Sequence, residues 1–225
     1  SVVRATADGY TLLFGSSSSF AVNPAVMRNL RFDVHKELKL IGLVSYTPHV
    51  LVVRSSLPAE TIGDLVRLAK GQPGKLSYAS AGAGNQTQLL AELFKSKAGI
   101  DVQHVPYKSG AEMVTAVLGN QVQISFTDIS ILLPLIRDGK VKPLAITGPK
   151  RHPALPEVPT LVESKIDHVA TFWTGVVAPA GTPEPIVTAL NGSINSGLMT
   201  AGVRETLERI GFAAPRSNGR VTRPS

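Results

Sequence analysis

The chain alternates between short apolar runs and segments whose apolar residues recur every three or four positions. The runs Val50–Val53 and Val102–Val105 predict strands. In the segment from Ile129 to Ile136, apolar residues stand at helical spacing. Strand–helix alternation of this kind over residues 75–147 predicts a parallel or mixed sheet flanked by helices, an α/β fold.

The same patterns extend over most of the chain. Further strands are expected at Tyr10–Phe14, Leu40–Val44, Lys75–Tyr78, Val122–Phe126, Pro143–Thr147 and Thr171–Ala178. Helices are expected around Ile62–Ala69, Leu89–Phe94, Met113–Leu118, Ile186–Leu198 and Val203–Ile210, with a short helix between residues 160 and 171. Four prolines within residues 149–160 predict an extended loop.

Polar loops follow the predicted strands of the central region. They are Ser80–Gln86, Tyr107–Gly110, Thr127–Asp128 and Thr147–Gly148. Right-handed crossovers would place most of these loops at one edge of the sheet. Ligands of open α/β sheets bind at that edge, so the loops indicate a binding site.

The stretch from Tyr78 to Gln88 carries the clearest indication of chemistry. Gly82 and Gly84 allow backbone N–H groups to turn toward a ligand, and Asn85 or Thr87 can cap the following helix. The free N–H groups of that first turn could hold a carboxylate without any Lys or Arg. The alternative is an ordinary strand–helix turn.

Two further features have both a functional and a structural interpretation. Gly15–Ser19 forms a small-residue loop after a predicted strand, which suits either a ligand loop or a flexible polar turn. Asp128 stands at a strand end, where it can cap a helix, contact a ligand, or do both.

Composition narrows the class of function. The net charge of +7 comes from small, separated basic groups without interleaved aromatic residues, so a solvated basic surface is expected and not nucleic-acid binding. The chain has 0 cysteines and 5 histidines, and the histidines never stand at metal-ligand spacing, so no metal is expected. No nucleotide fingerprint and no nucleophile–base pair occurs, so neither a cofactor nor an enzyme is expected.

Two long predicted strands, ending at Val53 and beginning near Trp173, bracket the central unit. This predicts a hinged molecule with a cleft between its lobes. The first lobe would comprise residues 1–54 and 173–225, and the second lobe residues 55–172. The tail at residues 214–225 has no periodicity and is expected to be poorly ordered.

Several segments, in order along the chain, resemble the substrate-binding proteins of tripartite tricarboxylate transporters, the Bug-type solute receptors. They are Ala7–Leu13, Lys75–Ser80, His104–Lys108, Pro153–Thr160 and Ala178–Pro183. The resemblance implies a two-lobed type II periplasmic-binding-protein architecture. It also implies a periplasmic receptor that closes over a small carboxylated solute and delivers it to membrane transporter subunits, without catalysis.

Carried over from that family, the pocket residues are Gly15, Ser16, Ser17, Ser18, Ser80, Ala81, Gly82, Gly84, Asn85, Gln86, Tyr107, Lys108, Ser109 and Asp128. In the family, backbone and hydroxyl groups hold the carboxylate, partly through waters. Asp128 would face an amino or hydroxyl group of the solute. The solute would be a dicarboxylate, a tricarboxylate, an aromatic acid or an acidic amino acid.

The sequence departs from the family at three places. The match begins in what is the family's second helix, so the first strand and its glycine-rich pocket loop are not in the sequence, and residues 1–10 contain no signal peptide. Ser109 intervenes before Gly110, and the tail after Gly211 is unlike the family's closing helix. Without its initial strands, the first lobe is expected to expose an apolar sheet edge and to self-associate.

Two other functions remain open on the sequence alone. A catalytic α/β enzyme acting on a small carboxylic acid would need a nucleophile–base pair or a metal set. A ligand-sensing domain of a transcription regulator shares the two-lobed logic, but the sequence contains no helix-turn-helix segment.

Overall fold

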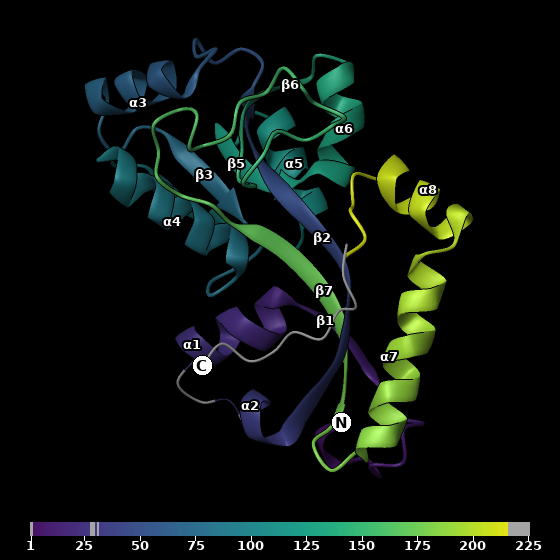
Figure 1. The fold of residues 1–225 in the computed structure, drawn as a ribbon. Helices are drawn as coiled ribbons and strands as arrows, with labels where there is room; N and C mark the ends of the chain where they lie inside the picture. Colours follow the sequence, from purple (N-terminus) through teal and green to yellow (C-terminus); the bar gives the residue numbers. More distant parts are fainter. Residues whose placement is uncertain (1, 28–29, 31, 216–225) are drawn as a thin grey trace. The chain divides into compact units, whose positions relative to one another are not determined.

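The computed structural model describes residues 2–27, 30 and 32–215. The chain divides into two compact units, Ser1–Tyr46 with Phe172–Ser225, and Thr47–Thr171 (Figure 1). Sequence analysis placed the division at 54/55 and 172/173, whereas residues 47–54 belong to the second unit. Of the tail that was expected to be poorly ordered, residues 216–225 lie outside the described part of the chain.

The second unit is built on a mixed sheet. The order of its strands is β6 (Val141–Ile146), β2 (Leu38–Arg54), β5 (Ile124–Asp128), β3 (Ser77–Ser80) and β4 (Gln103–Pro106). Strands β3, β4 and β5 are mutually parallel, whereas β2 runs antiparallel to both β5 and β6. The carboxyl ends of β3, β4, β5 and β6 therefore lie at one edge of the sheet.

Helices cover both faces of this sheet. Leu51 and Val53 pack with α3 (Ile62–Gly71) and α4 (Gln86–Ala98) on one face. Val50 and Val52 pack with α5 (Gly110–Leu118) and α6 (Ile129–Arg137) on the other. Figure 1 shows this pairing of helices around the sheet. A strand that is covered on both faces needs a continuous apolar run, which explains why residues 50–53 are all buried.

The helix boundaries follow from side-chain caps. Thr61 and Asp64 form a capping box at the start of α3. The Asn85 side chain accepts the Thr87 N–H at the start of α4, which confirms the predicted cap. Gly99, with φ of 62°, ends α4 in the left-handed conformation. These local signals can be read from the sequence, and the central helices were predicted correctly.

The first unit contains a smaller sheet in the order β1 (Leu13–Ser16), β7 (Thr171–Pro179) and the first part of β2. Val187 of α7 (Glu184–Leu198) packs with Ile41 and Ala178 on one face of it. Val177 packs with Phe20 on the other. Four further elements of the described chain are short: η1 (Val2–Arg4), η2 (Ser18–Val22), α1 (Asn23–Val26) and α2 (Val34–Glu37). A longer helix, α8 (Ala201–Arg209), follows α7.

Two of the predicted elements take a different form in the structure. The strands expected at Leu40–Val44 and Val50–Val53 are one strand, β2, which continues through Pro48. Proline is tolerated there because its missing N–H is not needed where the strand changes partners, from β7 before it to β5 and β6 after it. The short helix expected between residues 160 and 171 is a series of turns in which Lys165 has a φ of 64°.

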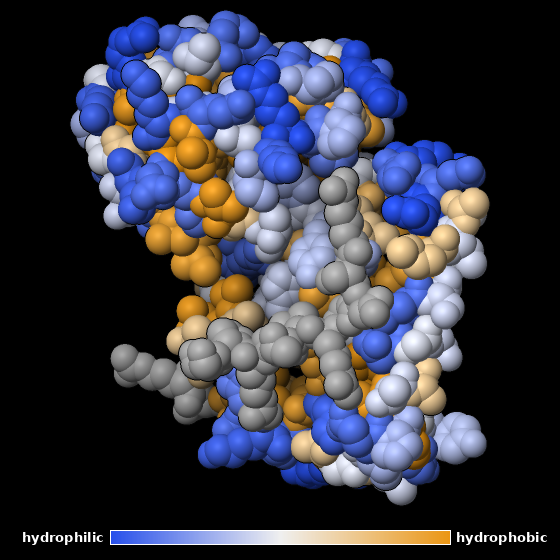
Figure 2. Space-filling view, viewed as in Figure 1, coloured by the Kyte–Doolittle hydropathy of each residue, from blue (hydrophilic) through white to orange (hydrophobic). Residues whose placement is uncertain are grey.

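The visible face of the second unit is largely hydrophilic (Figure 2), as expected for a solvated charged surface. No helix in the described residues combines the length and the apolarity that a membrane span requires.

Candidate functional site

Four polar loops meet at one sheet edge of the second unit, as the sequence predicted. The registers pair Ser80 with Pro106 and His49 with Asp128. At β6, the Thr147 hydroxyl accepts the His49 N–H at 2.9 Å. The ends of β3, β4, β5 and β6 are thus neighbours through their backbones, with His49 of β2 between two of them.

Two glycines lie where three of these loops come together. A Cβ on Gly82 would lie 3.7 Å from the Tyr107 carbonyl oxygen. A Cβ on Gly110 would lie 3.0 Å from Ile131 Cδ1 and 3.7 Å from Thr127 Cγ2. The loops after β3, β4 and β5 therefore form one continuous surface.

The Ser80–Gln86 loop joins β3 to α4, as the sequence predicted, but most of its amide groups are already hydrogen-bonded. Ala81 N–H donates to Thr87 Oγ1 at 2.9 Å, and Asn85 N–H donates to the Gly82 carbonyl at 3.3 Å. Gly82 N–H donates to Ser80 Oγ at 3.2 Å. Gly84 N–H donates to Gln88 Oε1 at 2.7 Å. The expectation of a set of unpaired amides is therefore wrong for these four residues.

Three amides of the loop donate to side-chain oxygens: Ala81 to Thr87, and the two glycines to Ser80 and Gln88. Gly82 and Gly84 have φ of 107° and 76°, and each donates to a side-chain oxygen. A side-chain acceptor can rotate away, whereas a backbone acceptor cannot. The side chain of the neighbouring Gln86 donates to the Thr171 carbonyl at 3.4 Å. Gly82 and Gly84 are thus exchangeable donors of the loop, and no Cβ stands beside their N–H groups.

The polar groups of Tyr107–Gly110 start a helix. Ser109 Oγ accepts the Glu112 N–H at 3.2 Å, and Glu112 Oε2 accepts the Lys108 N–H at 3.0 Å. Tyr107 N–H donates to the Ser80 carbonyl at 2.8 Å, and its hydroxyl donates to Gln121. These hydrogen bonds start α5 and join the loop to β3, which is a structural role. The Lys108 side chain is exposed.

Asp128 occupies the N-cap position of α6 but makes no capping hydrogen bond through its side chain. Its Oδ1 lies 3.6 Å from Nε2 of His49, and its side chain is 30% exposed. His49 is buried, and burial lowers its pKa although the nearby Asp128 carboxylate opposes that shift. The structure thus favours a neutral imidazole beside an acidic group that is open to solvent.

Two histidines of this edge, His49 and His104, were absent from the site prediction, and Thr147 was predicted only as part of a polar loop. His104 Nε2 lies 2.5 Å from Ser80 Oγ, and the His104 ring stacks on Tyr78 with centroids 5.0 Å apart. In a parallel pair, residues in register share a face with their second neighbours, so the register Tyr78–His104 puts His104 on the face of Ser80. That register is the signal that could have found it.

Ser80 and His104 also form a serine–histidine pair, which sequence analysis did not detect. A hydrolytic nucleophile must reach its substrate, but Ser80 is fully buried with 0% exposure. The other ring nitrogen of His104 faces Gln88 and not an orienting carboxylate. The pair is therefore built to hold a loop and not to attack a substrate.

The first-unit residues Gly15–Ser18 are only partly a loop. Gly15 and Ser16 belong to β1, where they pair with Gly175 and Thr174. A Cβ on Gly15 would lie 2.5 Å from Phe20 Cζ, so this glycine serves the packing of the Phe20 ring. Ser17 is buried, and Ser18 begins η2. The small-residue loop expected at Gly15–Ser19, either a ligand loop or a flexible turn, is thus a strand end followed by a helical turn.

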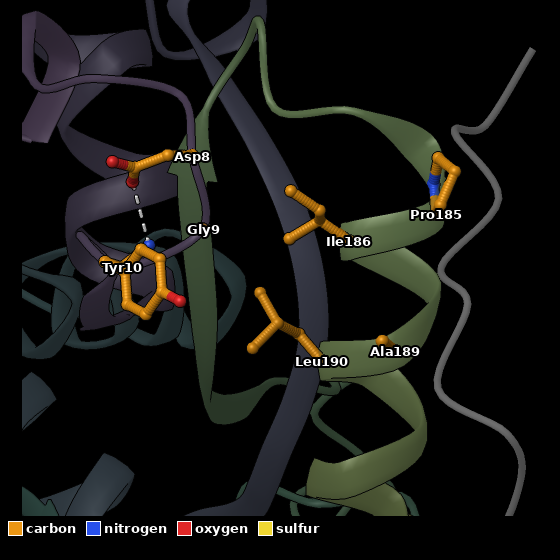
Figure 3. Close-up of a pocket in the computed structure, with 7 residues that line it drawn as sticks. All are labelled: Asp8, Gly9, Tyr10, Pro185, Ile186, Ala189 and Leu190. Carbon is orange, nitrogen blue, oxygen red and sulfur yellow. Dashed lines mark hydrogen bonds between the residues drawn. The ribbon is translucent and has the colours of Figure 1, made fainter.

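A pocket of about 410 Å³ lies elsewhere in the first unit, between the bend at Asp8–Tyr10 and α7 (Figure 3). Its walls are mainly apolar, and the Asp8 carboxylate is turned back to the Tyr10 N–H at 3.0 Å. It contains none of the predicted site residues. Within the described ranges, no group of three or more His, Cys, Asp and Glu residues could hold a metal ion.

Comparisons with known proteins show the family to which the chain belongs. The model of the tripartite tricarboxylate transporter family receptors matches residues 1–221. The chain belongs to this receptor family. A family member, BugT of Bordetella pertussis, is 34% identical over 210 residues, which cover 92% of this chain and 64% of BugT.

Solved structures of the receptor family superpose well. The R. palustris protein Rpa4515, solved with adipate, has a TM-score of 0.88 and 32% identity, covering 95% of this chain and 72% of that one. MatC from Rhodopseudomonas palustris, with bound malate, has a TM-score of 0.85 and 29% identity, covering 96% and 74%. The α/β periplasmic-binding-protein fold that the sequence predicted is thereby confirmed.

The chain spans 65% and 64% of the lengths of two curated receptor-family relatives that it matches. What the receptors bind and deliver therefore enters below as a proposal for this chain.

Proposed function

We propose that this protein binds a small carboxylated solute outside the cytoplasm, as a periplasmic receptor, and delivers it to subunits of a tripartite tricarboxylate-type membrane transporter. One observation supports this most: the strand-end loops of the second unit share one sheet edge, in a chain that superposes on a family structure holding adipate. Function at this edge also agrees with the general location of ligands in α/β sheets.

The carboxylate would bind at Gly82 and Gly84. Both N–H groups donate to side-chain oxygens, Ser80 Oγ and Gln88 Oε1, which a carboxylate oxygen can replace. The N-terminus of α4 adds partial positive charge at the same place. Because the anion would exchange one acceptor for another, no lysine or arginine is required.

Asp128 would determine which other functional groups of the solute are favoured. Its partly exposed carboxylate repels a second anionic group but accepts a hydrogen bond from a hydroxyl or ammonium group. Hydroxy acids and amino acids would therefore gain affinity from Asp128. On the family resemblance alone, we propose that Ser16–Ser18 supply further contacts to the solute.

Binding can be tested by calorimetry and thermal shift with adipate, malate, citrate, benzoate and glutamate. A ligand that binds only the folded protein raises the melting temperature, and the rise grows with the logarithm of the ligand concentration above Kd. At least one carboxylate should bind and be recovered unchanged. If none binds, the receptor function is wrong for this chain, and if one is converted to product, the enzyme alternative is favoured.

Two glycine variants localise the site. Gly84→Ala and Gly99→Ala each place a side chain at a positive φ, 76° and 62°, so both variants carry similar backbone strain of about 1 kcal/mol. Gly84 lies in the loop, whereas Gly99 ends α4 with nothing within 4 Å of an added Cβ. Gly84→Ala should abolish carboxylate binding while Gly99→Ala retains it. Equal affinities would exclude the glycine loop as the site.

A further inference from the structure

Hydrogen bonds link the N–H groups of Gly82 and Gly84 to a single histidine, His104. His104 Nε2 lies 2.5 Å from Ser80 Oγ, which accepts the Gly82 N–H. His104 Nδ1 lies 3.4 Å from Gln88 Nε2, and the oxygen of that amide accepts the Gly84 N–H. One ring on β4 is thus connected, through two side chains, to the N–H groups of both glycines.

The contacts determine which nitrogen of His104 carries the proton. Gln88 Oε1 is used by Gly84 N–H, so the Gln88 amide presents its NH₂ group to Nδ1. Nδ1 must then accept, which places the proton on Nε2, where it is donated to Ser80 Oγ. The Ser80 hydroxyl proton is left to the Gly82 carbonyl, 3.2 Å away. Every donor in this set has an acceptor when His104 is neutral.

Protonation of His104 is incompatible with this arrangement. A second proton on Nδ1 would face the Gln88 NH₂ group, so two donors would oppose each other. The amide can restore the bond only by turning its oxygen toward Nδ1. That rotation withdraws Oε1 from Gly84 N–H and leaves the Gly84 donor without an acceptor.

We propose that His104 is the positioning residue of the glycine loop: its neutral form keeps Gly84 N–H occupied by Gln88, and its protonated form releases that donor for a carboxylate. The ligand part of this inference rests on the function proposed above. Carboxylate affinity would then rise as His104 gains a proton, and by reciprocity a bound carboxylate would favour the protonated ring.

The charged surroundings of His104 come from two elements. Tyr78 of β3 stacks on the ring, and its hydroxyl donates to Glu92 Oε1 at 2.5 Å. On α4, Lys95 Nζ lies 3.0 Å from the same oxygen. Partial burial lowers the pKa of His104 below its ordinary value; the Glu92 carboxylate opposes this shift, and the Lys95 ammonium adds to it. The neutral form is therefore the resting form near neutral pH, and the added proton would bring positive charge next to the loop.

The loop response can be measured without any ligand. We would label glycine and histidine with ¹⁵N and follow the spectrum from pH 8 to pH 5. The Gly84 amide signal should titrate together with the His104 ring nitrogens, and the ring should be the Nε2–H tautomer at high pH. In His104→Gln the Gly84 signal should stay constant. His168→Gln is the matched control, because burial also lowers the pKa of His168 and the titration of Gly84 should persist there.

The ligand response is measured as a ratio, with adipate as the probe. The affinity of wild type relative to His104→Gln, taken at each pH, cancels the protonation of adipate itself. That ratio should increase about fivefold or more between pH 7.5 and pH 5.5. Gln88→Ala removes the competing acceptor, so it should bind adipate more tightly than wild type at pH 7.5 and depend less on pH.

The outcomes separate the two proposals. If the Gly84 amide signal does not change as His104 titrates, or if the affinity ratio does not change with pH, the proposed role of His104 is wrong. A Gly84 signal that follows His104 in a protein that binds no carboxylate at any pH confirms the loop mechanism and refutes the receptor function.

Discussion

Thr147 offers the sharpest test of how the sheet edge is held together. Its hydroxyl accepts the His49 N–H at 2.9 Å and donates to the Ala170 carbonyl at 2.8 Å. The residue is fully buried with 0% exposure. One hydroxyl therefore links the beginning of the second-unit part of β2, the end of β6 and the segment before β7.

Thr147→Val keeps the shape of the side chain and removes both bonds. A buried group that loses its only partner costs about 1–3 kcal/mol. The His49 N–H is buried and should lie within this range, whereas the Ala170 carbonyl is only partly buried and should cost less because water can reach it. We expect Thr147→Val to lower the free energy of unfolding by about 2–4 kcal/mol.

Thr147→Ser is the matched control. It keeps the hydroxyl and loses one buried methyl group, which should cost about 1 kcal/mol. Urea unfolding followed by far-ultraviolet circular dichroism gives both stabilities, and hydrogen exchange of peptides that contain His49 and Ala170 shows whether the loss is local. A valine variant as stable as the serine variant would refute the bridging role of the hydroxyl.

Three further predictions test other parts of the molecule. Gly15→Ala should destabilise the first unit by at least about 1 kcal/mol, because its Cβ would lie 2.5 Å from Phe20 Cζ. Trp173 fluorescence during urea unfolding measures this loss, and the control Gly192→Ala on α7, where an added Cβ meets nothing within 4 Å, should not destabilise. The free energy of unfolding should fall as the pH drops below about 6.5, because His49 takes up a proton there in the unfolded chain but, with its pKa lowered by burial, only at a lower pH in the folded protein. In His49→Gln the free energy of unfolding should depend less on pH between pH 7.5 and pH 5.5, and an unchanged slope would exclude His49 as the cause. Finally, Phe14 is 62% exposed on β1, the terminal strand of the described sheet order. Concentration-dependent association, measured by light scattering, should therefore decrease in Phe14→Lys but not in the control Leu118→Lys, which replaces a leucine that is 42% exposed on α5.

Local patterns predicted most of the second unit. The apolar periodicity located α3 to α6, the turn residues located the loops, and chain crossovers placed the loops at one edge. Errors arose where tertiary contacts override local preference. Pro48 suggested a break, but β2 continues because its partners change at that residue. The loop expected at Gly15–Ser19 became a strand end and a turn because the Phe20 ring lies against Gly15.

The candidate site shows a different limit. The sequence indicates which loops carry donors, since glycine and helix-cap residues mark them, but it does not show whether those donors are already used. Gly84 N–H is satisfied by Gln88, and Ser80 meets His104, 24 positions away in the chain. Such pairs depend on strand register, which one hydrophobic pattern leaves undetermined because a strand can shift by two residues and keep the same face buried. The backbone of a binding loop can therefore be anticipated from sequence, whereas the residues that control its donors appear only once the register is known.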